Sequence, residues 1–244
     1  MNLLANIEGR NPIIEALRSD RPIDKLMISN TSKEGSIKKI IGMAKEKNIV
    51  IQYVDKHKLD EISTSHSHQG VIAVVSDYKY YELEDLFEIA RERGEDPFFI
   101  ILDEITDPHN LGTIIRTADA AGVDAIIALK GCVDIYNPKV IRSTMGSIFD
   151  MNVIHTTQEE ALRILKLKKF DIVSSYLDTN NYYNTVEYNY KTALVIGNEA
   201  NGINEELVSK SDVLVKIPIY GKAESLNAAI SSAILMYEIK KYLV

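Results

Sequence analysis

The sequence predicts an α/β protein with two parts: a small N-terminal α/β domain and a larger C-terminal domain built on a parallel sheet. Apolar runs rich in β-branched residues recur along the 244-residue chain, and amphipathic stretches of helical period separate most of them. After residue 97 these runs are nearly continuous, which is typical of parallel strands covered on both faces. A charged interval precedes them. We therefore expect domains at 1–76 and 97–244, joined by a linker and a first helix at 77–96.

In the first domain, helices and strands are expected to alternate. A helix is predicted at 11–19, with Pro12 near its start, where the missing N–H group costs nothing. A second helix, at 36–48, carries an apolar stripe of Ile37, Ile40, Ile41 and Ala44. The predicted strands, rich in β-branched residues, are 23–29, 49–54 and 70–76.

The second domain continues the alternation. Its predicted strands are 98–102, 125–129, 140–146, 151–156, 170–176, 192–197 and 212–219. Its predicted helices are 110–121, 159–169 and 226–243. The last helix keeps one apolar stripe, and it ends in lysines that favour its dipole. The stripe consists of Leu226, Ile230, Ala233, Ile234 and Tyr237.

Composition limits the class of protein. The single cysteine, Cys132, excludes an intramolecular disulfide and suits a reducing compartment, where a small buried hydrophobe is its expected role. No apolar stretch reaches the length of a membrane helix, and the first residues lack the plan of a signal peptide. We therefore expect a cytoplasmic protein with no membrane partner.

Charge is unevenly distributed along the chain. The net charge is −7, but residues 1–75 hold 11 Lys and Arg against 9 Asp and Glu. If RNA binds, the N-terminal domain is thus the better candidate for phosphate contacts.

Three apolar runs break into loops of the kind that bind ligands. The segments are FFIILDEITDPHNLGTIIRTADAAG (98–122), LVIGNEANG (194–202) and IPIYGKAESLN (217–227). Backbone amides at the end of a strand are free to bind a ligand, and polar residues gather in all three loops.

Together these loops resemble the signature of the SpoU (TrmH) family of RNA ribose 2′-O-methyltransferases, which belong to the knotted SPOUT superfamily. The motif positions are filled by Asn110, Arg116, Glu199, Ser225 and Asn227. The resemblance implies a deep trefoil knot in the C-terminal domain, S-adenosylmethionine as cofactor, and a homodimer. Segments 8–17 and 67–75 resemble the RNA-binding extension of bacterial members that modify ribosomal RNA, which has a fold similar to ribosomal protein L30e. Arg10 is then the first residue expected to contact RNA.

The resemblance also implies where the cofactor lies. The twelve glycines include no Gly-x-Gly pair, so a dinucleotide-type phosphate loop is poorly supported. The cofactor is instead expected on the backbone around Gly197, Ile217 and Leu226, where Gly197 lets the chain approach the ligand closely. If the other motifs are left aside, the alternative explanation is that Gly197 only ends a strand and that Ile217 belongs to the core.

The polar motif residues suit methylation of a hydroxyl. A ribose 2′-hydroxyl is a poor nucleophile, so it must be oriented and assisted in losing its proton. We expect Arg116 to grip a phosphate and position the hydroxyl, because its pKa above about 12 makes it a poor base. Glu199 either orients Arg116 or accepts the proton, while Ser225 and Asn227 hold the loop and the substrate. Asn110 is equally explained as a catalytic residue or as the N-cap of a helix at 111–121.

One position departs from the family pattern. Where the family has Asn-Glu-Gly, this chain has Ala200 after Glu199, which would be strained if the position required a positive φ. No metal is expected, because His66 and His68 have no nearby cysteines or carboxylate cluster.

The sequence thus predicts an S-adenosylmethionine-dependent RNA 2′-O-methyltransferase acting on a guanosine of 23S rRNA. A tRNA guanosine or an rRNA adenosine is the alternative substrate. A catalytically idle RNA-binding protein on the same scaffold is the alternative of another class.

Overall fold

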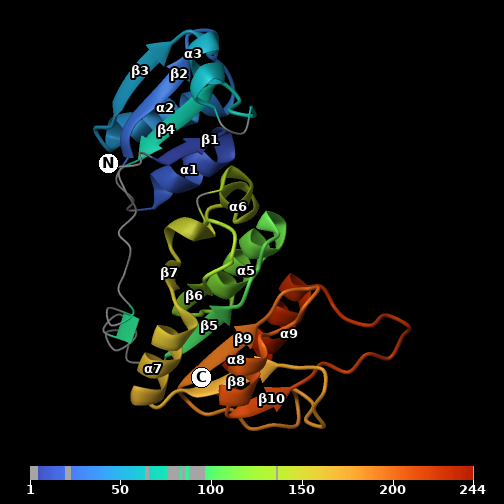
Figure 1. Cartoon of the computed structure of the whole chain (residues 1–244). Helices are drawn as coiled ribbons and strands as arrows, with labels where there is room; N and C mark the ends of the chain where they lie inside the picture. Colours follow the sequence, from blue (N-terminus) through green and yellow to red (C-terminus); the bar gives the residue numbers. More distant parts are fainter. Residues whose placement is uncertain are drawn as a thin grey trace. The chain divides into compact units, whose positions relative to one another are not determined.

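The chain folds into two compact units in the computed structural model (Figure 1), which describes residues 5–19, 23–63, 66–75, 83, 86–87, 97–135 and 137–243. Unit 1 comprises residues 1–79 together with 135–150, and unit 2 comprises 80–134 and 151–244. Most of the expected linker at 77–96 lies outside the described residues. The domain limits given above stay predictions.

Unit 1 is built on a four-stranded sheet in the order β1-β4-β2-β3. Its strands are β1 (Ala5–Glu8), β2 (Ile23–Ser29), β3 (Val50–Val54) and β4 (Val71–Val75), and its helices include α1 (Arg10–Arg18), α2 (Ser36–Glu46) and α3 (Lys56–Ile62). Strand β4 runs antiparallel to β1 and β2, whereas β2 and β3 are parallel. This arrangement confirms the small N-terminal α/β fold. The short elements β1 and α3 were not predicted.

A segment from the second half of the sequence completes the core of unit 1. Helix α6 (Pro138–Ser143) and the 3₁₀ turn η1 (Ser147–Phe149) contribute Ile141 and Phe149 to the apolar cluster that contains Ile13 and Leu17. The strand predicted at 140–146 is therefore wrong. Asn137 caps α6 by accepting a hydrogen bond from Lys139 N at 2.9 Å. This helix-start signal, followed by proline, outweighs the β-branched residues that suggested a strand.

Unit 2 contains the parallel sheet that the apolar runs predict. Its strands are β5 (Phe98–Leu102), β6 (Ala125–Leu129), β7 (Asn152–Thr156), β8 (Asp171–Ser175), β9 (Thr192–Ile196) and β10 (Val213–Val215). They form one six-stranded sheet in the order β10-β8-β9-β5-β6-β7, with every pair parallel. The strand predicted at 212–219 stops at Val215, and Lys216 pairs instead with the loop of residues 181–183, where its N donates to Asn181 O at 2.9 Å.

Helices cover both faces of this sheet (Figure 1). Helices α7 (Gln158–Leu167) and α8 (Glu205–Lys210) pack with Phe99 and Ile101 of β5 in one apolar cluster. Leu83, Leu86 and Phe87, part of the first helix expected before the sheet, join this cluster. Helices α5 (Pro108–Ala120) and α9 (Ala228–Lys240) pack against each other, and α9 also contacts β9. The alternation of side chains along a strand places the two groups of helices on opposite faces.

Helix α9 is apolar on two sides. Its buried face consists of Ala228, Ala229, Ser232, Leu235, Met236 and Ile239. The stripe predicted from the sequence lies on the other side, where Ile230 is 56% exposed and Tyr237 is 53% exposed. Among the described parts of the chain, no helix is both long enough and apolar enough to cross a membrane.

Cys132, in the turn after β6, should be chemically inert in the folded protein. Its thiol donates to Leu102 O at 3.3 Å, and burial raises the pKa of Cys132 to about 11. Because the thiolate is the reactive form, we expect iodoacetamide at pH 8 to alkylate the native protein far more slowly than the protein in denaturant. Equal rates in the two states would contradict this. Folding favours the neutral thiol, so this group should begin to destabilise the fold above about pH 9, as the unfolded thiol ionises.

Candidate active site

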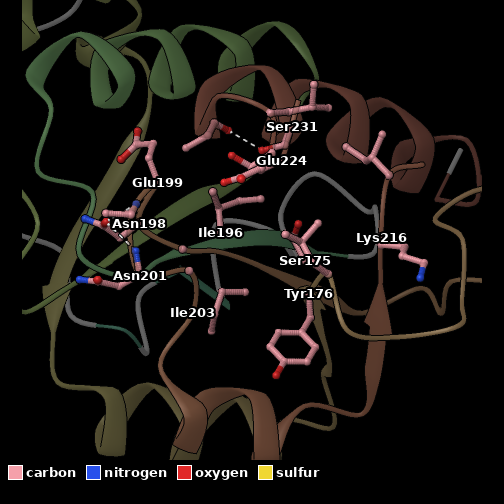
Figure 2. Close-up of a pocket in the computed structure, with 18 of the residues that line it drawn as sticks. Ser175, Tyr176, Ile196, Asn198, Glu199, Asn201, Ile203, Lys216, Glu224 and Ser231 are labelled. Atoms are coloured by element: carbon pink, nitrogen blue, oxygen red, sulfur yellow. Dashed lines mark hydrogen bonds between the residues drawn. The ribbon is translucent and has the colours of Figure 1, made fainter. Parts of the chain in front are cut away.

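A cavity of about 480 Å³ opens at the carboxyl ends of β8, β9 and β10 (Figure 2). Because these strands are parallel, the loops that follow them meet at one edge of the sheet. The loop after β9 forms one wall, and the segment between β10 and α9 forms another. The volume lies within the range of about 300–1,000 Å³ that small-molecule sites occupy.

The cavity collects the residues predicted to bind the cofactor. Gly197, Ile217 and Leu226 all line it, although they come from two separate segments, 194–202 and 217–227. Glu199 and Ser225, two of the predicted catalytic residues, line it as well. Their assigned roles stay predictions, but the structure places all five residues around one space.

Gly197 is needed for a reason that the sequence did not reveal. A Cβ atom at this position would lie 2.4 Å from both the C and O atoms of Gly202, a distance that no side chain tolerates. Gly197 thus allows two backbone segments of the loop to approach each other, and it thereby shapes the wall of the cavity.

Asn198 organises the same loop. Its backbone exchanges two hydrogen bonds with Gly202, N to O at 3.0 Å and O to N at 2.8 Å. Its side-chain oxygen accepts from Ala200 N at 2.8 Å and from Asn201 N at 3.2 Å, while its Nδ2 donates to Glu104 O at 2.8 Å. Asn198 therefore ties the loop after β9 to the loop after β5. Asparagine in a strand-ending turn is the signal from which this role could have been inferred.

The departure at Ala200 carries no backbone strain. Six non-glycine residues of the described chain have a positive φ, and Ala200 is not one of them. The concern that this position requires glycine is therefore unfounded.

Three of the predicted catalytic residues are joined by side-chain hydrogen bonds. Asn110 Nδ2 donates to Glu199 Oε1 in a short hydrogen bond. Asn227 Nδ2 donates to Asn110 Oδ1 at 2.9 Å, and Asn227 Oδ1 caps α9 by accepting from Ala229 N at 2.9 Å and Ile230 N at 3.3 Å. An ionised carboxylate only accepts hydrogen bonds, so all hydrogen bonds of this series are donated in the same direction. They run from the N-terminus of α9 through Asn227 and Asn110 to Glu199.

Asn110 is not a helix cap. Helix α5 begins at Pro108, and Asp107 caps it by accepting from His109 N at 3.1 Å and Asn110 N at 3.3 Å. Asp followed by Pro is the stronger start signal, so the N-cap explanation of Asn110 is wrong. The side chain of Asn110 is instead directed to Glu199 and Asn227.

Arg116 lies about 1.7 turns beyond Asn110 along α5 and is exposed. No hydrogen bond or ion pair of its side chain with another residue of the described chain is found. In particular, Glu199 pairs with Asn110 rather than with Arg116. The guanidinium group is consequently free to bind an external anion.

Further charged groups at the cavity were not predicted. Asp178 and Glu224 line it together with Glu199, and Lys216 lies across from Glu199 and Asn198 (Figure 2). Three carboxylates against one ammonium group favour a cationic ligand. Glu224 directly precedes Ser225 in the third loop, so its position beside a motif residue was the available signal.

Arg10 lies in unit 1, at the first residue of α1. It contacts the loop that contains His68 and Gln69, and its Nε donates to Gln69 O at 3.1 Å. His68 pairs with Asp60 at 2.9 Å. Within the described residues, no group of three His, Cys, Asp or Glu side chains is placed to hold a metal ion.

Comparison with known proteins identifies the family. The SpoU rRNA Methylase family matches residues 97–237, and the family described as RNA 2′-O ribose methyltransferase substrate binding matches residues 6–81. A TrmH-family tRNA/rRNA methyltransferase of Bacillus subtilis (strain 168) is 39% identical over 95% of this chain and 93% of its own length.

Two solved structures differ in how much of the chain they cover. An AdoMet-bound rRNA methyltransferase from Sinorhizobium meliloti has a TM-score of 0.80 at 28% identity, covering 98% of this chain and 88% of its own. A TrmH/SpoU tRNA modifying enzyme from A. aeolicus has a TM-score of 0.53 at 28% identity, covering 65% of this chain and 82% of its own.

Fold and site together define an RNA methyltransferase of the SPOUT class. More specifically, the chain belongs to the SpoU (TrmH) family. Its cofactor is S-adenosylmethionine, which supplies a methyl group bound to a positively charged sulfur. The size of the cavity and its excess of carboxylates suit this cation.

Gly197→Ala tests how the cavity is built. The added methyl group would meet the backbone of Gly202, so we expect a loss of about 1–3 kcal/mol in the free energy of unfolding. Calorimetry should also show weakened binding of S-adenosylmethionine. Gly221→Ala is the matched control, because a Cβ there meets nothing within 4 Å and should change stability by less than about 0.5 kcal/mol. Parental stability and cofactor affinity in Gly197→Ala would contradict this account of the loop.

Proposed function

We propose that this protein methylates the 2′-hydroxyl of a ribose in RNA, on a guanosine of 23S rRNA. The observation that carries the proposal is the chain of hydrogen bonds from Asn227 through Asn110 to Glu199. It fixes a carboxylate on the wall of the cofactor cavity, where the proton of a hydroxyl must be received as a methyl group arrives.

Each polar residue then has a distinct task. Glu199 accepts a hydrogen bond from the ribose hydroxyl and takes its proton. Asn110 holds Glu199 in place through its Nδ2, and Asn227 orients Asn110. Ser225, on the opposite loop of the cavity, donates to the bound ligands.

Arg116 would bind the phosphate next to the target ribose. Its planar guanidinium group can hold two oxygen atoms at fixed positions, which orients the hydroxyl without any proton transfer by arginine. The exposure of Arg116 and its lack of partners in the described part of the chain support this role. Gly197, Ile217 and Leu226 would contact the cofactor through their backbone.

The extent of the structural matches supports rRNA over tRNA. The structure named as an rRNA methyltransferase matches 98% of this chain, whereas the tRNA modifying enzyme matches only 65%. The rRNA methyltransferase therefore matches a larger part of this chain than the tRNA modifying enzyme does. This is expected if the protein has a substrate-binding unit at residues 6–81. An rRNA adenosine remains the alternative, and guanosine rests on the family resemblance. A cytoplasmic location is also part of the proposal, since ribosomal RNA is found there.

A homodimer, formed through the exposed stripe of α9, is part of the proposal. Ile230 and Tyr237 expose more than half of their surface on a helix that is already packed on its other side. An apolar stripe of this kind is typical of a subunit interface. The trefoil knot implied by the resemblance is proposed for the segments that enclose the cavity.

The methyl-transfer reaction tests the function directly. The protein should transfer a labelled methyl group from S-adenosylmethionine to ribosomal RNA, and nucleoside analysis should find it on the 2′-oxygen of guanosine. Methylated adenosine, or label in tRNA alone, would favour the alternative substrates. Cofactor binding without any transfer would favour an idle RNA-binding protein.

Arg116→Lys should reduce kcat by at least about 100-fold while cofactor binding persists. Lysine keeps the charge but loses the fork that positions two groups at once. If Arg116 were the base, lysine, with a pKa of about 10.4, would restore activity steeply in alkaline buffer. If Arg116 only positions the substrate, raising the pH above neutral should rescue the variant weakly. Arg163→Lys, on the exposed surface of α7, is the control. Activity of Arg116→Lys within about twofold of the parent, ~0.4 kcal/mol in barrier height, would remove Arg116 from the site.

Ile230→Glu should convert the dimer to a monomer, because it places a charge in an apolar interface. Light scattering coupled to size-exclusion chromatography measures the mass. Leu167→Glu is the matched control, since Leu167 is 71% exposed at the end of α7. A parent protein that is monomeric, or an unchanged dimer in Ile230→Glu, would exclude this interface.

A further inference from the structure

Glu104, in the loop after β5, has a backbone conformation that its local structure does not explain. Its φ is 53°, in the left-handed region that non-glycine residues seldom adopt. Among the described residues of unit 2, the other such residue is Lys169, with φ 62°, which follows the end of α7, where this conformation is common. Glu104 follows a strand instead. Such conformations persist only where surrounding contacts enforce them, and they concentrate at functional sites.

The contribution of Glu104 lies in its backbone. Its side chain is exposed, and no hydrogen bond or ion pair joins that side chain to another described residue. The stem of the side chain passes close to Gly131 in the turn after β6, where an added Cβ would lie 2.9 Å from Glu104 Cγ. The turn therefore leaves room for Glu104 but gives its carboxylate no polar partner.

The backbone of Glu104 helps to hold both ends of the loop after β9. The Glu104 carbonyl oxygen accepts a hydrogen bond from Asn198 Nδ2 at 2.8 Å. The preceding residue, Asp103, is buried, and its Oδ2 accepts from Asn204 N at 2.7 Å. The left-handed residue changes the direction of the chain after Asp103, so that the next carbonyl group can face the start of the loop.

The segment that contains Glu104 contacts this loop a second time, at Glu199. Asn110, further along the same segment, donates to Glu199 Oε1. Asn198 and Glu199 follow each other on the wall of the cavity (Figure 2). One segment thus holds two consecutive residues of the loop, the first through a backbone oxygen and the second through a side chain. If the first contact is lost, Asn110 is the remaining described partner of the Glu199 carboxylate.

From this geometry we propose that Glu104 is a positioning residue for methyl transfer. Its left-handed backbone fixes Asn198, and through Asn198 it fixes the cavity wall and the carboxylate of Glu199. Glu104 is not part of the cavity lining, so it acts only through the loop. The inference rests on the proposed function, in which Glu199 receives the proton. A misplacement of about 1 Å at a reacting group can lower the rate about 100-fold, so a contact outside the cavity can control kcat.

Glu104→Ile tests the role of the backbone, because a β-branched residue strongly disfavours a positive φ. Transfer of a labelled methyl group to ribosomal RNA should show kcat lowered by at least about tenfold, and calorimetry should show weaker binding of S-adenosylmethionine. Glu104→Gly should retain kcat and affinity within about twofold of the parent, since glycine adopts this conformation freely. Failure of Glu104→Gly to do so would overturn the proposal.

Lys169→Ile is the matched control. It imposes the same unfavourable substitution at a left-handed residue of unit 2, but at the end of α7 and outside the cavity lining. It should lower the melting temperature as Glu104→Ile does, while kcat and cofactor affinity stay at the parental values. An equal loss of kcat in both variants would reduce the role of Glu104 to stability and would overturn the proposal.

Asn198→Asp breaks the same hydrogen bond without changing Glu104, so it also tests the proposal if Glu104→Ile does not fold. Aspartate keeps an oxygen for Ala200 N and Asn201 N but has no donor for Glu104 O. The variant should also lose kcat, and adding Glu104→Ile should lower kcat by no more than about a further twofold. Parental kcat in Asn198→Asp, or additive losses in the double variant, would overturn the proposal.

Cofactor binding separates this inference from the proposed function. If the parent binds S-adenosylmethionine but methylates no RNA, the function fails, and weaker binding by Glu104→Ile still supports the positioning role. If the parent methylates RNA and Glu104→Ile does so at the parental rate, the positioning role is wrong and the function stands.

Discussion

Parallel pairing of β9 with both β5 and β8 determines where everything else in unit 2 can lie. In a parallel sheet all carboxyl ends reach one edge, so the loops that begin at Asp103, Gly197 and Lys216 must meet there. Asn198 then ties the loop after β9 to that after β5 through Glu104 O. The cavity at the ends of β8, β9 and β10 and the hydrogen bonds of Asn110 follow from this meeting, because neither exists within any one segment of sequence.

The sheet was largely predictable because its strands are buried on both faces. Residues 98–102, 125–129 and 192–196 are apolar runs in which every residue is buried. The prediction failed at 140–146, where Val140 and Ile141 resemble a strand but follow Asn137 and a proline that start a helix. Composition within a short run could not decide between the two structures, because the decisive residues lay outside it.

The sequence predicted which loops form the candidate site, but it did not predict the geometry of the site. The three loops identified the polar residues, yet nothing in the sequence could tell that Asn110 binds Glu199 while Asp107 caps the helix. Gly197 was predicted to let the backbone approach a ligand, whereas in the structure it lets the backbone approach Gly202. Glu224 was missed because a lone carboxylate in a loop is usually solvated. Such distinctions depend on which backbones approach each other, and that is a property of the folded chain.

Asn227 uses both ends of its amide: the oxygen receives the first N–H groups of α9, and the nitrogen holds Asn110. Orienting Asn110 and Glu199 costs conformational entropy, and this entropy is therefore lost when the helix forms, before any RNA binds. Under the proposed function, RNA binding would then order Arg116 and the exposed loop around Ser225. The folding of a helix would thus make the proposed proton acceptor, Glu199, rigid, while the residues proposed to contact the nucleic acid would stay adaptable.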